Sequence, residues 1–170
     1  FIRNQVVMSR GILWKFVTVN DRFVSLHNTF IFPQLASQYA QCLLLSFSRN
    51  NLYIGYGDES PMLRGQWHPR KPGEPGLGFK PNWMTDVDYD GFDWGTSSYA
   101  FNYLGSRLTS IPSLTSATGQ EAHGIRIDRG TCFQTFNVPG GPRLTTIPPQ
   151  FMTLNAGCPA VNAGVVLANI

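Results

Sequence analysis

The chain has 170 residues, and its 42% content of hydrophobic residues excludes an intrinsically disordered protein. Charged residues make up only 14% of the chain, against roughly a quarter in ordinary soluble domains. The net charge is +3 and no basic patch is present, so nothing indicates a nucleic-acid partner. The length suffices to bury the core of one domain. Low charge favours an extracellular or self-assembling protein over a cytosolic enzyme.

The first segment that we expect is an N-terminal one, residues 1–56, in which Pro and Gly are scarce. Its apolar residues recur at steps of three or four, which is the spacing of a helix. Residues 34–48 contain good helix formers, and Pro33 suits a first helical turn. The β-branched and aromatic residues near its start favour strands instead. We predict that residues 12–50 are largely helical and form contacts between subunits.

The second expected segment is a globular, β-rich region, residues 57–170. Its first part, residues 57–95, is a long loop with closely spaced Pro and Gly, which forbid regular structure. Short apolar runs then alternate with turn residues, and residues 124–128, 131–138 and 164–168 are predicted strands. No internal repeat is visible.

The chain contains three cysteines, none of them in the C-x-x-C spacing of a zinc or redox site. Cys132 and Cys158 are the natural pair in an oxidising compartment, and their disulfide would contribute roughly 3 kcal/mol. Three buried free thiols are the alternative. Cys42 lies in an apolar run and is expected in the core. We identify no secretory signal, and no uncharged run is long enough for a membrane-spanning helix.

An acidic cluster precedes Gly91 and is the strongest candidate for a metal site. Carboxylates at alternate loop positions, followed by Gly at the sixth, are the arrangement that a Ca²⁺ loop uses. The candidate ligands are Asp86, Asp88, Asp90 and Asp93, with the backbone carbonyl of Phe92. Position 12 of this loop is Ser97 rather than the usual Glu. The alternative is a solvated acidic turn without a metal.

The sequence offers no catalytic constellation. The three histidines are isolated along the chain, and no nucleophile elbow, phosphate loop or dinucleotide motif is present. We therefore predict that the protein is not an enzyme. Trp83 and Trp94 flank the acidic cluster, where they can stack on sugar rings or pack against another subunit. A calcium-dependent carbohydrate-binding module that uses Asp86, Asp88 and Asp90 is one interpretation.

Residues 94–118 and 33–55 resemble the bacterial type IV pilin-like proteins and pseudopilins. The resemblance rests on Ser98-Tyr99-Ala100-Phe101-Asn102, Leu108-Thr109-Ser110-Ile111-Pro112-Ser113, Pro33-Gln34-Leu35 and Asn50-Asn51-Leu52-Tyr53-Ile54-Gly55. It implies an α+β fold, with a long N-terminal helix packed on an antiparallel β-sheet. It also implies assembly of identical subunits into an extracellular filament. The residues expected at the assembly contact are Phe1, Gln5, Phe23, Leu26, Phe30, Leu35 and Tyr39.

A second resemblance concerns residues 28–36, which are similar to a Phe-Pro-x-Leu segment of jelly-roll coat proteins of small RNA viruses. It implies an all-β sandwich or jelly roll that builds a shell. The principal expectation is thus a non-enzymatic, self-assembling, extracellular subunit whose partners are copies of itself. The calcium-dependent carbohydrate-binding module, with a glycan as surface ligand, and the viral coat protein are its alternatives.

Overall fold

The computed structural model describes residues 2–3, 5–7, 14–16, 23–32, 38–40, 46–55, 63–65, 85–95, 98–103, 106–134 and 153–168. Its strands are β1 (Gln5–Val7), β2 (Trp14–Phe16), β3 (Phe23–Leu26), β4 (Thr29–Phe32), β5 (Gln38–Ala40), β6 (Ser46–Arg49), β7 (Leu52–Gly55), β8 (Leu63–Gly65), β9 (Thr85–Asp88), β10 (Gly91–Asp93), β11 (Phe101–Tyr103), β12 (Ser106–Leu108) and β13 (Ile125–Arg126); the helices are α1 (Ile111–Thr118) and α2 (Arg129–Cys132).

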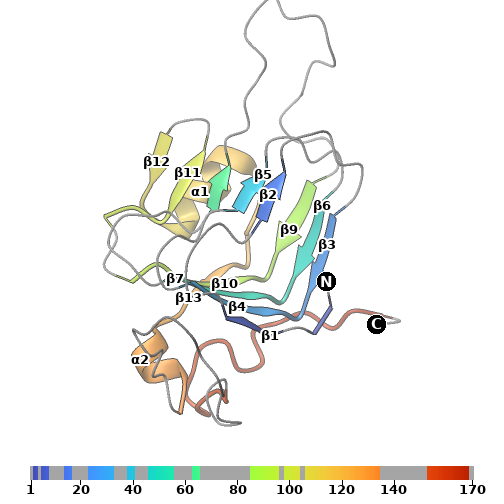
Figure 1. The fold of residues 1–170 in the computed structure, drawn as a ribbon, viewed down its shortest axis with the longest axis vertical. Coiled ribbons are helices and arrows are strands. Elements are labelled where there is room, and N and C mark those ends of the chain that lie inside the picture. The colour runs from blue at the N-terminus through green and yellow to red at the C-terminus, as the bar shows by residue number, and fades with distance from the viewer. Residues whose placement is uncertain are drawn as a thin grey trace, which may run out of the picture.

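The strands stack in parallel, so that successive coils of the chain each add one strand to each stack (Figure 1). One sheet has the order β1-β4-β7-β10-β13, and all its pairs are parallel. A second has the order β3-β6-β9, also parallel. The third side is formed by the parallel pairs β2-β5 and β8-β11, with β12 antiparallel to β11. This is the arrangement of a parallel β-helix.

Three ten-residue segments occupy equivalent places in successive coils, residues 23–32, 46–55 and 85–94. Each contains a strand, a corner and a second strand. The corner residues His27, Asn50 and Tyr89 have φ of 53°, 59° and 61°, the left-handed conformation that redirects the chain. The expectation that the chain has no internal repeat is therefore wrong. The repeat lies in backbone conformation and polarity more than in residue identity.

The interior of the β-helix is filled by a column of aromatic rings. Phe30, Tyr53 and Phe92 stand at the same position of β4, β7 and β10, and their ring centroids lie 5.2 and 5.4 Å apart. Phe101 meets Phe92 edge-on at 5.2 Å. Leu114 of α1 packs in the same cluster. Large aromatic surfaces buried in this way supply much of the stabilisation of the stack.

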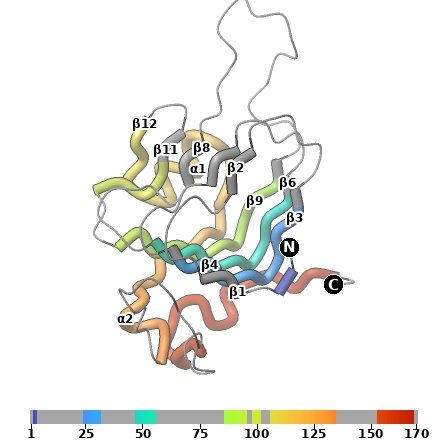
Figure 2. The backbone as a smooth tube through the Cα atoms, viewed as in Figure 1, coloured from blue at the N-terminus to red at the C-terminus, as the bar shows by residue number. Residues whose placement is uncertain are grey.

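The C-terminal segment, residues 153–168, packs on the outer face of the same sheet, against β4, β7 and β13 (Figure 2). Ile31 and Ile54 lie in a second core cluster with Ile127, Cys132, Phe133 and Cys158. Asn50 fixes the far end of this segment, because its side-chain amide donates to the Val165 carbonyl and accepts from the Val165 N–H, both at 2.8 Å. The sheet is therefore buried on both faces.

The expected fold, a long N-terminal helix packed on an antiparallel sheet, is wrong. The described part of residues 12–50 contains β2 to β6, and the two described helices have eight and four residues. Strands buried on both faces read as near-continuous apolar runs, in which helical spacing occurs by chance. The all-β alternative is closer, but a sandwich or jelly roll needs antiparallel strands and most pairs here are parallel.

Of the three predicted C-terminal strands, residues 124–128 contain β13, and no strand is found in residues 164–168. The predicted strand 131–138 begins within α2, and its residues 135–138 lie outside the described residues. The segment from residue 153 onwards is held by its disulfide and by turns, so its apolar residues pack without a sheet. Neither described helix is long and apolar enough to cross a membrane.

Two of the residues expected at an assembly contact lie in the core of the subunit. Leu26 and Phe30 are buried in the subunit, with exposed fractions of 2% and 0%. Gln5, Phe23 and Tyr39 lie in three different strands, β1, β3 and β5. Phe1 and Leu35 are outside the described residues. The boundary proposed near residue 56 falls between β7 and β10, which pair in one sheet.

Candidate functional site

A column of polar side chains lies inside the corner between the two main sheets. Asn28, Asn51 and Asp90 each follow a left-handed corner residue, and with Glu121 they form what we call the corner ladder. The backbone N–H of each residue donates to the side chain of the next: Asn28 to Asn51 Oδ1 at 3.0 Å, Asn51 to Asp90 Oδ1 at 2.8 Å and Asp90 to Glu121 Oε2 at 3.3 Å. The ladder satisfies backbone groups that a buried corner leaves without partners.

Side-chain amides reinforce the first two steps of the ladder. Asn28 Nδ2 donates to Asn51 Oδ1 at 2.9 Å, and Asn51 Nδ2 donates to Asp90 Oδ1 at 3.0 Å. Ser25 and Ser48 add hydroxyl contacts from the preceding strands. The equivalent position beside Asp90 is Val87, which has no hydroxyl. The corner ladder therefore changes from the amides Asn28 and Asn51 to the acids Asp90 and Glu121 at the coil where Val87 stands in place of a serine.

The two acids at the end of the ladder have strongly altered pKa values. Burial raises the pKa of Asp90 to about 6, although hydrogen bonds from Asn51 and Ser48 act in the opposite direction. Burial, followed by the nearby charge of Asp90, raises the pKa of Glu121 well above its usual value. Burial therefore favours the protonated form of Glu121.

Glu121 also lines a pocket of about 600 Å³, which we call the helix-end pocket. Its wall includes Trp94, Ser110, Ile111, Ser116, Glu121 and Arg126. Glu121 is only 1% exposed, and its Oε1 is without a hydrogen-bond partner among the described residues. Buried polar atoms are normally hydrogen-bonded, so an orphaned one at a pocket wall indicates a place for a ligand.

The other groups around the helix-end pocket are an aromatic ring, a cation and a helix end. The Arg126 guanidinium lies 4.4 Å from the centroid of the Trp94 ring, a cation–π contact. Ser110 caps α1 by accepting a hydrogen bond from the Ser113 N–H at 3.2 Å. The first turn of α1 has no acidic side chain. The positive end of the helix dipole therefore faces no compensating carboxylate from its own first turn.

The expected calcium ligands point to different places. Asp86 pairs with Arg49 on the outside of the second sheet, whereas Asp90 is inside the corner. Asp93 lies on the opposite side of β10 and binds the Arg129 guanidinium at 2.7 Å and its N–H at 2.9 Å. Alternate residues of a strand share one face, but the corner at Tyr89 interrupts this pattern, so the four acids are dispersed rather than gathered.

Asp88 completes this pattern, because it binds His123, at 2.7 Å to the N–H and 2.8 Å to Nδ1. Partial burial raises its pKa, but the hydrogen bonds from His123 and from the Tyr89 N–H outweigh that effect, and the pKa is lowered. Phe92 places its side chain in the core. No group of three His, Cys, Asp or Glu side chains in the described ranges is placed to hold a metal ion.

We expect calcium to have no effect on the stability of this region. Each aspartate already has a protein partner, so a cation would have to break four sets of contacts to gather them. Thermal unfolding in excess calcium and in chelator checks this. The expected midpoints agree, both for the natural chain and for Asp88→Asn. A thermal midpoint that rises with calcium in the natural chain but not in Asp88→Asn would support the calcium-binding loop instead.

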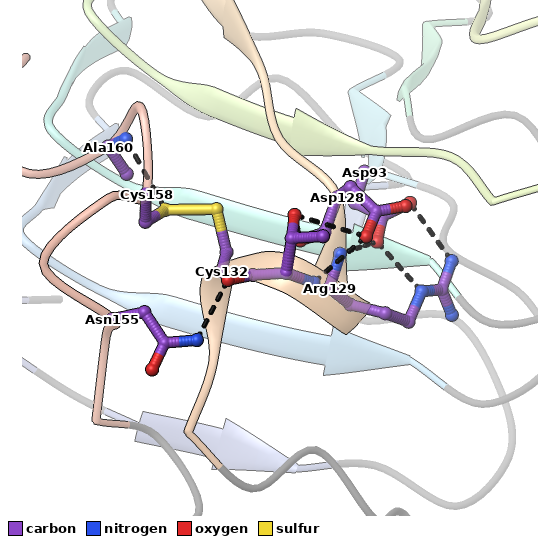
Figure 3. The surroundings of a disulfide bond; sticks show 8 residues. Asp93, Asp128, Arg129, Cys132, Asn155, Cys158 and Ala160 are labelled. Atoms are coloured by element: carbon purple, nitrogen blue, oxygen red, sulfur yellow. Dashed lines mark hydrogen bonds and ion pairs between the residues drawn. A yellow bond between two sulfur atoms is a disulfide. The ribbon is translucent and has the colours of Figure 1, made fainter.

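The disulfide between Cys132 and Cys158 is present, as predicted (Figure 3). It joins the end of α2 to the C-terminal segment. Close to it, the side chain of Asn155 donates to the Thr131 carbonyl at 2.8 Å, and Arg129 holds Asp93. The bridge thus closes the covering segment over the outer face of the sheet. Cys42 lies outside the described residues.

Sequence reasoning missed Glu121, Arg126 and the contact of His123 with Asp88. Tyr89 stacks on His123 with ring centroids 4.5 Å apart, which makes an exposed aromatic pair from residues that are far apart in the sequence. The recurring polar residue after each corner could have revealed Asn28, Asn51 and Asp90. Nothing local marks Glu121, since its role depends on the end of the ladder.

Comparison of the chain with protein-family models, with curated proteins and with solved structures found no match.

Proposed function

We propose that this protein is a carbohydrate-binding β-helix that holds a sugar residue in the helix-end pocket. The observation that carries the proposal is the buried residue Glu121, which lines a pocket of about 600 Å³ and whose Oε1 has no hydrogen-bond partner in the described part of the chain. A pocket of this size is in the range used for small ligands. The aromatic residue expected beside a sugar, Trp94, lines this pocket.

The chemistry of the wall suits a ligand rich in hydroxyl groups. Such a ligand needs both donors and acceptors, together with an apolar surface for its C–H faces. Thr109, Ser110 and Ser116 supply hydroxyls, and Trp94 and Ile111 supply apolar surface. The pocket therefore offers a sugar hydrogen-bond donors and acceptors, as water does, together with an apolar surface.

The geometry favours binding over hydrolysis. Enzymes that cleave glycosidic bonds use two carboxyl groups about 5 Å or more apart, with the bond between them. Asp90 is instead fully buried in the corner ladder, where its carboxylate accepts hydrogen bonds from Asn51 and Ser48. It is therefore not placed to act on a sugar bound in the pocket. The proposed activity is recognition without chemical conversion, with no requirement for calcium.

The Cys132–Cys158 disulfide supports an extracellular or otherwise oxidising location for this function. The self-assembly prediction is untested, but the N-terminal helix on which it depended is replaced by strands. We therefore place carbohydrate binding first.

Blocking the pocket tests the proposal. We expect Ser116→Trp to abolish binding of the glycans that the natural chain retains, because Ser116 is an exposed residue of α1 at the pocket wall. Ser106→Trp is the matched control, since Ser106 is exposed on β12 and does not line the pocket. A glycan array followed by calorimetry gives the measurement. Equal binding by the two variants, or no glycan bound by the natural chain, would contradict the proposal.

A further inference from the structure

The helix-end pocket is lined by a cation, Arg126, that forms no ion pair with the described residues. In the described ranges, Arg49 and Arg129 are paired with Asp86 and Asp93, whereas no ion pair is formed by Arg126. Its guanidinium rests on the ring of Trp94 and is exposed at the pocket. A guanidinium on an aromatic face keeps its N–H donors at the ring edge, where they can reach a planar anion.

The N-terminal end of α1 lies at the same pocket. Ser110, Ile111 and Pro112 all line it. Pro112 has no N–H, and the N–H groups of Ser113 and Leu114 already donate to Ser110, so this end offers an anion the Ile111 N–H and the partial positive charge of the helix dipole. A helix end with these properties binds anions when one is within reach.

Glu121 supplies the second, independent observation. It is 1% exposed, lines the pocket and has an Oε1 without a partner in the described part of the chain. Burial and the neighbouring Asp90 raise its pKa, which favours its neutral form. Among the described residues of the pocket wall, Arg126 is the cationic side chain.

We propose that the helix-end pocket selects an acidic sugar, whose anionic group lies between Arg126 and the N-terminal end of α1 while its hydroxyls reach Glu121. This inference rests on the proposed carbohydrate-binding function and adds the class of sugar. A neutral sugar would leave Arg126 and the helix end facing water or an unfilled cavity. A carboxylate or a sulfate ester on the sugar would satisfy both.

The test compares matched ligands on the natural chain by calorimetry at low salt. The probes are a uronic acid disaccharide, the neutral disaccharide of the same stereochemistry and linkage, a sulfated disaccharide, and acetate and sulfate ions. We expect the acidic disaccharides to bind at least about tenfold more tightly than the neutral one. We expect acetate and sulfate alone to bind far more weakly. The preference should shrink as salt is added, because the contact is electrostatic.

Two arginine variants assign the effect to this pocket. Arg126→Gln is expected to reduce the preference for the acidic sugar by about tenfold and to change binding of the neutral sugar little. Arg107→Gln is the matched control, because Arg107 is also exposed and also lies over an aromatic ring, Tyr99 at 4.9 Å, but does not line the pocket. The control is expected to keep the full preference.

The outcomes separate the inference from the function on which it rests. If neutral and acidic disaccharides bind equally, or if both arginine variants keep the preference, the sugar-binding function stands and the acidic selection is overturned. If acetate or sulfate binds as tightly as the acidic disaccharides, the pocket is an anion site and the sugar inference is overturned. If no saccharide binds, the proposed function itself fails. An acidic preference that only Arg126→Gln removes would support both.

Discussion

Asn51→Ala is expected to lower the free energy of unfolding by about 3 to 5 kcal/mol. The Asn51 side chain holds three levels of the corner ladder together. Its Oδ1 accepts from the N–H and Nδ2 of Asn28, and its Nδ2 donates to the Ser25 carbonyl and to Asp90. Truncation leaves several of these groups buried without partners, and each costs roughly 1 to 3 kcal/mol.

Asn155→Ala is the matched control for this substitution. Asn155 is also an asparagine whose amide reaches a backbone carbonyl, at 2.8 Å from Thr131, but it is only part-buried and joins no network. Its loss is expected to cost about 1 kcal/mol. Chemical denaturation of the two variants and the natural chain gives the comparison. Equal losses would show that the ladder is not a principal source of stability.

Asp90→Asn is expected to stabilise the protein above about pH 6 and to leave it nearly unchanged near pH 4. Burial raises the pKa of Asp90 from 3.8 to about 6 in the folded chain. A raised pKa contributes stability that is present below the unfolded pKa and is lost as the pH rises through the folded pKa. Two pKa units correspond to roughly 3 kcal/mol, which the natural chain loses and the variant keeps.

The amide at position 90 also suits the ladder, because its oxygen can accept from Asn51 as the carboxylate does and its nitrogen can donate to the Ser48 hydroxyl, which now donates to Asp90 Oδ2. Removing the charge of Asp90 also removes one of the two main causes that raise the pKa of Glu121. Asp88 has a lowered pKa, so its ionisation makes stability rise with pH. Both chains contain Asp88, so its contribution cancels in the difference between their free energies of unfolding.

The measurement is the free energy of unfolding of Asp90→Asn and of the natural chain between pH 4 and pH 8. Asp86→Asn is the control, because Asp86 is an exposed carboxylate outside the ladder. The control curve is expected to run parallel to the natural one. If the Asp90→Asn curve does so as well, the buried pair does not set the pH dependence of stability.

The β-helix could have been predicted from the sequence by aligning residues 23–32, 46–55 and 85–94. The signal is a polar residue after each corner, Asn28, Asn51 or Asp90, followed two positions later by an aromatic ring. It is weak because the spacing between coils changes from 23 to 39 residues, as the Asn51-to-Asn28 and Asp90-to-Asn51 separations show. A fixed-period search does not find such a repeat.

The candidate pocket could not have been predicted in the same way. Glu121, Trp94 and Arg126 meet only because α1 and β13 follow the last coil of the ladder. The altered pKa of Glu121 depends on Asp90, 31 residues earlier in the chain. The density of acidic residues between Asp86 and Asp93 predicted a shared metal site, but the path through β9, the corner and β10 separates their side chains. The disulfide could be predicted from the sequence because few pairings of three cysteines are possible.

The most direct test of the account is an amide-resolved NMR titration with an acidic disaccharide. We predict that the changes in chemical shift concentrate in the groups that line the helix-end pocket, which are Ser110, Ser116, Glu121, Arg126 and the indole N–H of Trp94. Residues of the outer face of the second sheet, such as Val24 and Asp86, should not move. Saturable shifts at the outer face, with the pocket signals unchanged, would contradict the central claim.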